Sequence, residues 1–130
     1  MAEHLLLMVE CAVVLHSTFA LVIKTNSIMK EIQIVEKGEN FTMVNVGKLN
    51  EIKEYELAMG NFSIPGKMFA GHALQATGAE LSFQSLAAGQ DYGTLHAHKT
   101  HEELYFILKG EGIFEVDGKR FPISEGSIVR

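Results

Sequence analysis

Short apolar segments alternate with turn residues from residue 30 to residue 130, and this pattern restricts the chain to an all-β fold. The segments are rich in Val, Ile, Phe and Tyr, and Gly, Asn and Asp interrupt them at short intervals. Many short strands separated by turns are typical of a β-sandwich or a β-barrel. The pattern predicts strands at residues 41–46, 55–59, 68–74, 80–87, 94–98, 103–109, 112–116 and 120–123.

The last three predicted strands are joined by turn sequences. KGEG at 109–112 and VDGK at 116–119 carry the glycines and aspartate that tight turns require, and they predict a meander. Segment 103–108 has large apolar side chains on both alternating faces, so we expect that strand to be buried on both sides. GNFSIPGK at 60–67 predicts a loop within one domain.

The N-terminal segment differs from the rest of the chain, because residues 5–23 are almost continuously apolar. A signal peptide would need a basic start and a small-residue cleavage site, whereas a membrane span would bury Glu10 and His16. The favoured interpretation makes Met29 the natural start and residues 1–28 an apolar extension. A weak membrane anchor and a packed helix are the alternatives, and residues 29–130 form the single predicted domain.

Charge argues against a nucleic-acid partner, and cysteine content argues against a disulfide and a thiolate metal site. The net charge is -5 and no run of Lys or Arg exists, so nucleic acid is not an expected partner. Cys11 is the single cysteine and lies far from the histidines, which argues against an internal disulfide and a thiolate metal site. We expect a cytoplasmic protein.

A histidine-rich segment, HAHKTHEE at 96–103, carries the candidate chemistry. On an extended strand, His96 and His98 project to the same face and can reach one ion. Glu103, at the start of the next strand, can add a carboxylate oxygen. Two imidazoles and one carboxylate suit a divalent transition metal, namely Fe, Mn, Ni, Zn or Cu, better than Ca. The alternative interpretation is that these residues are surface groups in a polar turn and bind no metal.

Other polar residues near this segment have alternative roles. Alternation along the strand puts Glu102 on the face opposite Glu103, so Glu102 is expected in solvent. His101 is interpreted as a turn residue, and the alternatives are a variant metal ligand or a partner that orients Glu103. His72 is expected as a core or rim residue of an apolar strand. Four aromatic residues are interpreted as core and alternatively as pocket walls: Phe83, Tyr92, Tyr105 and Phe114.

The spacing of His96, His98, Glu103 and Gly110 resembles the first motif of the cupin family. The pattern's upstream glycine falls on Gln90, with Gly89 one position early, and the resemblance runs from about Phe41 to the C-terminus. It implies a double-stranded β-helix, or jelly-roll, barrel that holds a metal through His96, His98 and Glu103. Gly126 resembles the first residue of the second motif. The fourth-ligand histidine and the closing strands are not in this sequence, so we expect an incomplete barrel.

The same resemblance implies a protein that binds a small organic ligand beside a metal ion. Metal-dependent oxygenases and isomerases share this motif, and the alternative is a non-catalytic binding or sensory module. Fold alone does not choose among them. No catalytic residue is assigned. Further expectations are a homodimer for the complete domain and no membrane partner.

Overall fold

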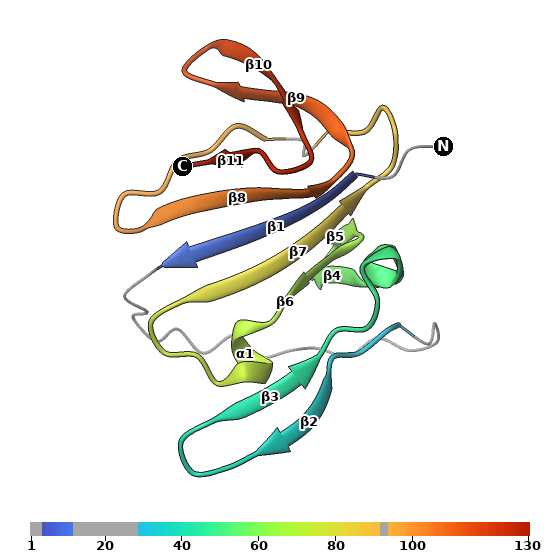
Figure 1. Ribbon diagram of the computed structural model, residues 1–130, viewed down its shortest axis with the longest axis vertical. Coiled ribbons are helices and arrows are strands. Elements are labelled where there is room, and N and C mark those ends of the chain that lie inside the picture. Colours follow the sequence, from blue (N-terminus) through green and yellow to red (C-terminus); the bar gives the residue numbers. More distant parts are fainter. Residues whose placement is uncertain (1–3, 12–28, 92–93) are drawn as a thin grey trace.

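The computed structural model describes residues 4–11, 29–91 and 94–130 (Figure 1). Strands dominate these residues, so the all-β prediction is confirmed. The strands are β1 (His4–Cys11), β2 (Gln33–Lys37), β3 (Thr42–Asn45), β4 (Glu56–Met59), β5 (Phe62–Pro65), β6 (Lys67–Phe69), β7 (Glu80–Leu86), β8 (Glu102–Lys109), β9 (Glu111–Val116), β10 (Lys119–Ser124) and β11 (Ile128–Val129). Two short helices complete the list: η1 (Leu49–Glu54) and α1 (Gly71–Leu74).

The largest sheet has five strands in the order β11-β8-β1-β7-β6, and all its neighbours are antiparallel. Three further pairs form separate two-stranded sheets: β9 with β10, β2 with β3, and β4 with β5. Figure 1 shows β9 and β10 at one end of the molecule, and β2 and β3 at the other. The described strands do not close into a continuous hydrogen-bonded barrel, in agreement with the expected incomplete barrel.

Strand β1 comes from the apolar N-terminal segment and lies between β7 and β8 (Figure 1). Its Leu7 is paired with Phe83 on one side and Phe106 on the other. The alternative of a packed helix is therefore wrong over residues 4–11, while residues 12–28 lie outside the described residues. The domain boundary at Met29 stays a prediction. Within the described residues, no helix has the length and apolar character needed to cross a membrane.

One face of the sheet packs on the hydrophobic core. The buried cluster consists of Ile52, Tyr55, Met68 and Ala70, and Leu81, Phe83 and Leu108 from β7 and β8 pack against it. Helix η1 supplies Ile52, which is completely buried. The Tyr55 hydroxyl donates a hydrogen bond of 2.9 Å to the Val46 carbonyl, so its polar end is satisfied inside the cluster.

Some local predictions were wrong. The strand expected at 68–74 ends at Phe69, and the chain then turns into α1, where His72 is exposed and not a core residue. The loop expected at 60–67 contains β5, which pairs with β4 across a turn at Gly60. Strand β2 and helix η1 were not predicted at all. Short elements of this kind depend on tertiary neighbours more than on local pattern.

The predicted meander is correct for one of its two turns. Strands β9 and β10 pair through the turn at Asp117 and Gly118, but β8 and β9 lie in different sheets. The chain changes sheet at Gly110, whose φ of 92° favours glycine. Tyr105 and Phe114 meet across this bend with ring centroids 5.0 Å apart, an edge-to-face contact that joins the two sheets.

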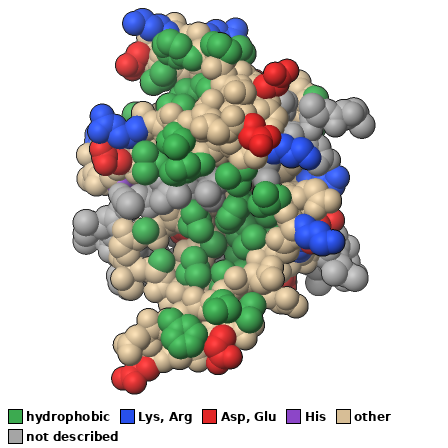
Figure 2. Space-filling view, in the orientation of Figure 1, with side chains coloured by type: hydrophobic (Ala, Val, Ile, Leu, Met, Phe, Trp, Pro, Cys, Tyr) green, Lys and Arg blue, Asp and Glu red, His purple; other side chains and the backbone are tan. Residues whose placement is uncertain are grey.

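Apolar side chains remain on the surface at both ends of the molecule (Figure 2). Phe41 and Met43 are exposed in and beside the β2–β3 pair, and Ile113 and Phe121 are exposed in the β9–β10 pair. Both hairpins therefore present apolar surface that no other described element covers.

Candidate metal centre

The start of β8 positions Glu103 beside the segment that carries the two histidines. Glu103 is the second residue of β8 and its backbone is fixed by pairing with β1. Residues 94–98 are exposed and form no strand, so the strand predicted there is wrong. A strand needs a hydrogen-bonded neighbour, and no described strand pairs with this segment.

The three predicted site residues nevertheless come together. Glu103 Oε2 lies 3.6 Å from His96 Nε2 and 3.6 Å from His98 Nε2. One donor atom from each residue lies within 4.8 Å of the others. The two imidazole rings are nearly perpendicular, with centroids 5.1 Å apart. A single ion can therefore be reached by all three side chains.

Donor chemistry and spacing fit a transition metal. Two ligands at metal distances of about 2.1 Å are about 3.4 Å apart in a tetrahedral site, close to the observed 3.6 Å. Glu103 Oε1 is buried and has no hydrogen-bond partner among the described residues. A buried carboxylate oxygen costs free energy unless a cation or donor satisfies it, and a bound ion would do so.

A backbone contact selects the ring nitrogen that His96 offers. Nδ1 of His96 lies 3.4 Å from the Thr94 carbonyl. The tautomer with hydrogen on Nδ1 donates to this oxygen and leaves the lone pair of Nε2 directed at the cluster. This is the usual arrangement for a metal-binding imidazole.

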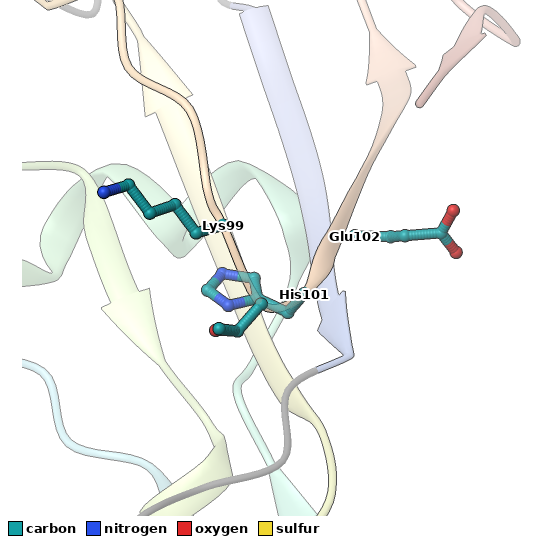
Figure 3. A pocket seen from close by; sticks show the side chains of 4 residues that line it. Lys99, His101 and Glu102 are labelled. Atoms are coloured by element: carbon teal, nitrogen blue, oxygen red, sulfur yellow. The ribbon is translucent and has the colours of Figure 1, made fainter.

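Glu102 and His101 occupy different environments beside the cluster. Glu102 is exposed and accepts a hydrogen bond of 3.1 Å from Arg130, in agreement with its expected solvent position. The ring of His101 lies against that of His98, with centroids 3.9 Å apart. A shallow hollow runs along this turn, and Figure 3 shows Glu102 directed away from Lys99 and His101.

The sequence pattern did not predict two buried polar side chains on β7, those of Ser82 and Gln84. Ser82 and Gln84 are both only 1% exposed, and neither Ser82 Oγ nor Gln84 Oε1 has a hydrogen-bond partner among the described residues. In the sequence LSFQSL these residues alternate with apolar ones and would normally be assigned to solvent. Their burial is a feature of the tertiary structure that the local sequence pattern does not predict.

The aromatic residues have mixed outcomes. Phe83 packs on the core, as predicted, and Tyr105 contacts Phe114 across the two sheets. Tyr92 lies outside the described residues.

Comparison with known proteins finds similarity over the C-terminal part of the chain. The cupin domain profile matches residues 82–130, which contain all three clustered side chains. An uncharacterised protein of Methanocaldococcus jannaschii is 40% identical over 35 residues, covering 27% of this chain and 28% of that protein. The oxalate-binding protein of Thermotoga maritima is 44% identical over 43 residues, covering 33% and 35% respectively.

The matched segments are short. The chain spans about a third of the length of these curated relatives. No solved structure matches the chain. The match over residues 82–130, the clustered His96, His98 and Glu103, and the all-β architecture agree with one another, so residues 82–130 are similar to a cupin domain.

Proposed function

We propose that the chain binds one divalent transition metal ion through His96, His98 and Glu103, and a small organic acid at that ion. The convergence of three donor atoms within 4.8 Å is the observation that carries the proposal. The buried, unpartnered oxygen of Glu103 supports it, because a cation would satisfy that oxygen.

The protein's own residues would have distinct roles. The carboxylate of Glu103 supplies negative charge, while neutral His96 and His98 supply nitrogen donors. The carbonyl of Thr94 holds the ring of His96 in the metal-binding tautomer. When bound, the ion would act as a Lewis acid toward the oxygen atoms of a ligand. Three protein donors leave room for such a ligand in a site of four to six positions.

Oxalate is the first ligand to test. The Thermotoga maritima relative is named an oxalate-binding protein, and its 43 matched residues are a third of this chain. Oxalate carries two adjacent carboxylates, which suit bidentate coordination to a hard or borderline ion. Binding without turnover is the simplest function consistent with these features.

Plasma mass spectrometry of the purified full chain tests metal binding. We expect close to one transition metal ion per chain, and loss of that ion in His96→Ala and Glu103→Ala. Glu102→Ala is the matched control, since it removes a neighbouring carboxylate of the same strand that faces solvent, and it should retain the metal. Absence of metal from the unaltered chain, or full retention in both cluster variants, would reject the site.

Calorimetric titration of the metal-loaded chain with oxalate tests ligand binding. Heat of binding should appear with the metal-loaded chain and disappear in His96→Ala. An oxygenase or an isomerase would use the same open positions, so oxygen consumption with the bound acid is the discriminating assay. Consumption of oxygen in step with loss of the acid would replace the binding function with an oxygenase.

The expected homodimer also belongs to this proposal. The exposed apolar side chains of the β2–β3 and β9–β10 pairs are compatible with a contact between copies. Light scattering after size-exclusion chromatography gives the molecular mass in solution. A monomer across the accessible concentration range would contradict the dimer and leave the metal site unaffected.

A further inference from the structure

A second glutamate is the direct neighbour of Glu103 in the sheet. Strand β1 runs between β7 and β8, and its residue Glu10 is paired with Glu103 of β8. Residues paired across antiparallel strands share a face, and their Cβ atoms are about 4.5–5.5 Å apart. The register therefore places Glu10 on the face from which Glu103 meets His96 and His98.

The register is regular where Glu10 lies. The shift between β1 and β8 falls between Leu5 and Leu6, and the pairing is continuous from Leu6 to Cys11. On its other side, β1 pairs with β7 without a shift, and Glu10 is opposite Glu80. A slip of one residue would move Glu10 to the other face of the sheet. Both neighbouring strands thus assign Glu10 to the face of Glu103.

Glu80, the third glutamate in this row, is already used by the fold. Its Oε1 accepts hydrogen bonds from Gly71 N–H at 2.6 Å and from Leu81 N–H at 3.0 Å, so the carboxylate holds the start of α1 against β7. Glu80 is also two strands away from Glu103, roughly 10 Å between the backbones. Glu10 is therefore the glutamate of this row that adjoins the metal cluster.

Two carboxylates opposite each other in a sheet are unfavourable without a cation. Like charges on directly paired residues of antiparallel strands destabilise the pairing. The side chain of Glu103 is only 12% exposed, and its Oε1 makes no hydrogen bond among the described residues. A divalent cation at the candidate metal centre would offset the repulsion and satisfy that oxygen.

The sequence around Glu10 gives no packing reason for an acidic residue. Glu10 is the one acidic residue of the apolar stretch at 5–23, and residues 5–9 of the same strand are all apolar. Glutamate is depleted in strands, because it fits poorly on a half-buried pleated surface. Its position opposite Glu103 supplies a role that packing does not.

From these observations we infer that Glu10 is a fourth protein ligand of the ion at the candidate metal centre, so that strand β1 completes the site. The inference rests on the proposed metal site and specifies its ligand set. Two imidazoles and two carboxylates leave two positions of a six-coordinate ion for a bidentate organic acid.

Titration of the metal-free full chain with Co²⁺, followed by visible absorption, tests this ligand set, because the absorption of Co²⁺ depends on the atoms that bind it. Glu10→Gln should weaken Co²⁺ binding by at least about ten-fold, since even the loss of a residue that only orients a ligand costs that much. It should also change the absorption spectrum of the bound ion. Metal-free Glu10→Gln should melt no lower than the metal-free unaltered chain, because the opposed like charges are gone.

Glu80→Gln is the matched control. It removes one charge from the same row and keeps an oxygen for the Gly71 and Leu81 N–H groups, so Co²⁺ affinity and spectrum should stay unchanged. An equal loss of affinity in Glu10→Gln and Glu80→Gln would overturn the inference, because charge alone would explain it. A lowered melting temperature of metal-free Glu10→Gln would also overturn it, because a weakened strand would explain the loss.

The remaining outcomes separate this inference from the proposed function. Unchanged Co²⁺ affinity in Glu10→Gln, or weaker affinity with an unchanged spectrum, would overturn Glu10 as a ligand. Loss of Co²⁺ binding in His96→Ala would in that case keep the three-residue site intact. Failure of the unaltered chain to bind Co²⁺ would reject both the site and its fourth ligand.

Discussion

The imidazole of His101 lies against the imidazole of His98, with ring centroids 3.9 Å apart and planes inclined by 35°. His98 Nε2 is 3.6 Å from Glu103 Oε2, whereas His101, at the turn before β8, does not belong to the cluster of donor atoms formed by His96, His98 and Glu103. The contact favours His101 as a residue that holds His98 in place over His101 as a direct ligand.

Replacing these two histidines should therefore have unequal effects. We expect His98→Ala to lose the bound ion, because it removes a ligand. His101→Ala should keep one ion per chain with affinity about ten-fold weaker, in the range seen when a residue that orients a ligand is removed. Metal titration measures both, and Lys99→Ala in the same turn serves as the control. Equal loss of metal in both histidine variants would make His101 a ligand.

Gly66 joins the core to the sheet at a position where no side chain fits. Its N–H donates to the Tyr55 carbonyl at 2.7 Å, and its carbonyl accepts from Ser85 N–H at 2.9 Å. Its φ is 73°, and an added Cβ would lie 2.4 Å from the Ser85 carbonyl oxygen. We expect Gly66→Ala to reduce the free energy of unfolding by about 2 kcal/mol or more.

Urea denaturation measures this change. Gly78→Ala is the matched control, since a Cβ there meets nothing within 4 Å and its φ is not positive. The control should change the free energy of unfolding by less than about 0.5 kcal/mol. Equal stability of the two variants would show that the backbone at Gly66 and Ser85 can move apart to accept a side chain.

Ile52 is the completely buried centre of the core cluster. Truncation to alanine removes buried methylene and methyl groups and leaves a cavity, so Ile52→Ala should cost about 2–5 kcal/mol. Ile34→Ala, at a residue that is 59% exposed, should cost less than about 1 kcal/mol. Thermal unfolding compares them. A small effect at Ile52 would mean that η1 does not pack on the sheet.

The ion pair between Lys30 and Glu51 predicts acid-dependent stability. A hydrogen bond from the Lys30 ammonium, and a second from the Lys48 N–H, hold the pKa of Glu51 below its ordinary value of 4.5. Because the folded pKa is the lower one, this pair stabilises the fold above about pH 4.5. The contribution is lost as the pH falls through the lowered pKa of the folded state.

Glu51→Gln should therefore be less stable than the unaltered chain at pH 7, with the difference shrinking below pH 4.5. Thermal unfolding between pH 7 and pH 3 measures it. Glu39→Gln, at an exposed residue of the β2–β3 turn, is the control and should follow the unaltered chain. A constant difference between Glu51→Gln and the unaltered chain at every pH would attribute the effect to packing, not to charge.

The sequence alone indicated the class of fold and the members of the candidate metal cluster. Turn residues between short β-branched and aromatic segments are local signals, so β7, β8, β9 and β10 were predicted within a residue or two. The spacing of His96, His98 and Glu103 identified them as candidate ligands. Their side chains lie close together even though residues 94–98 form no strand. A short connection to β8 suffices to bring those side chains together.

Tertiary structure decided the features that depend on distant partners. The apolar stretch at the N-terminus carries no local sign that His4–Cys11 would pair with both β7 and β8, because strand pairing is non-local. Ser82 and Gln84 alternate with apolar residues as a solvent face would, yet both are buried in the folded chain. Local pattern specifies which residues share a face, whereas the arrangement of strands specifies what covers that face.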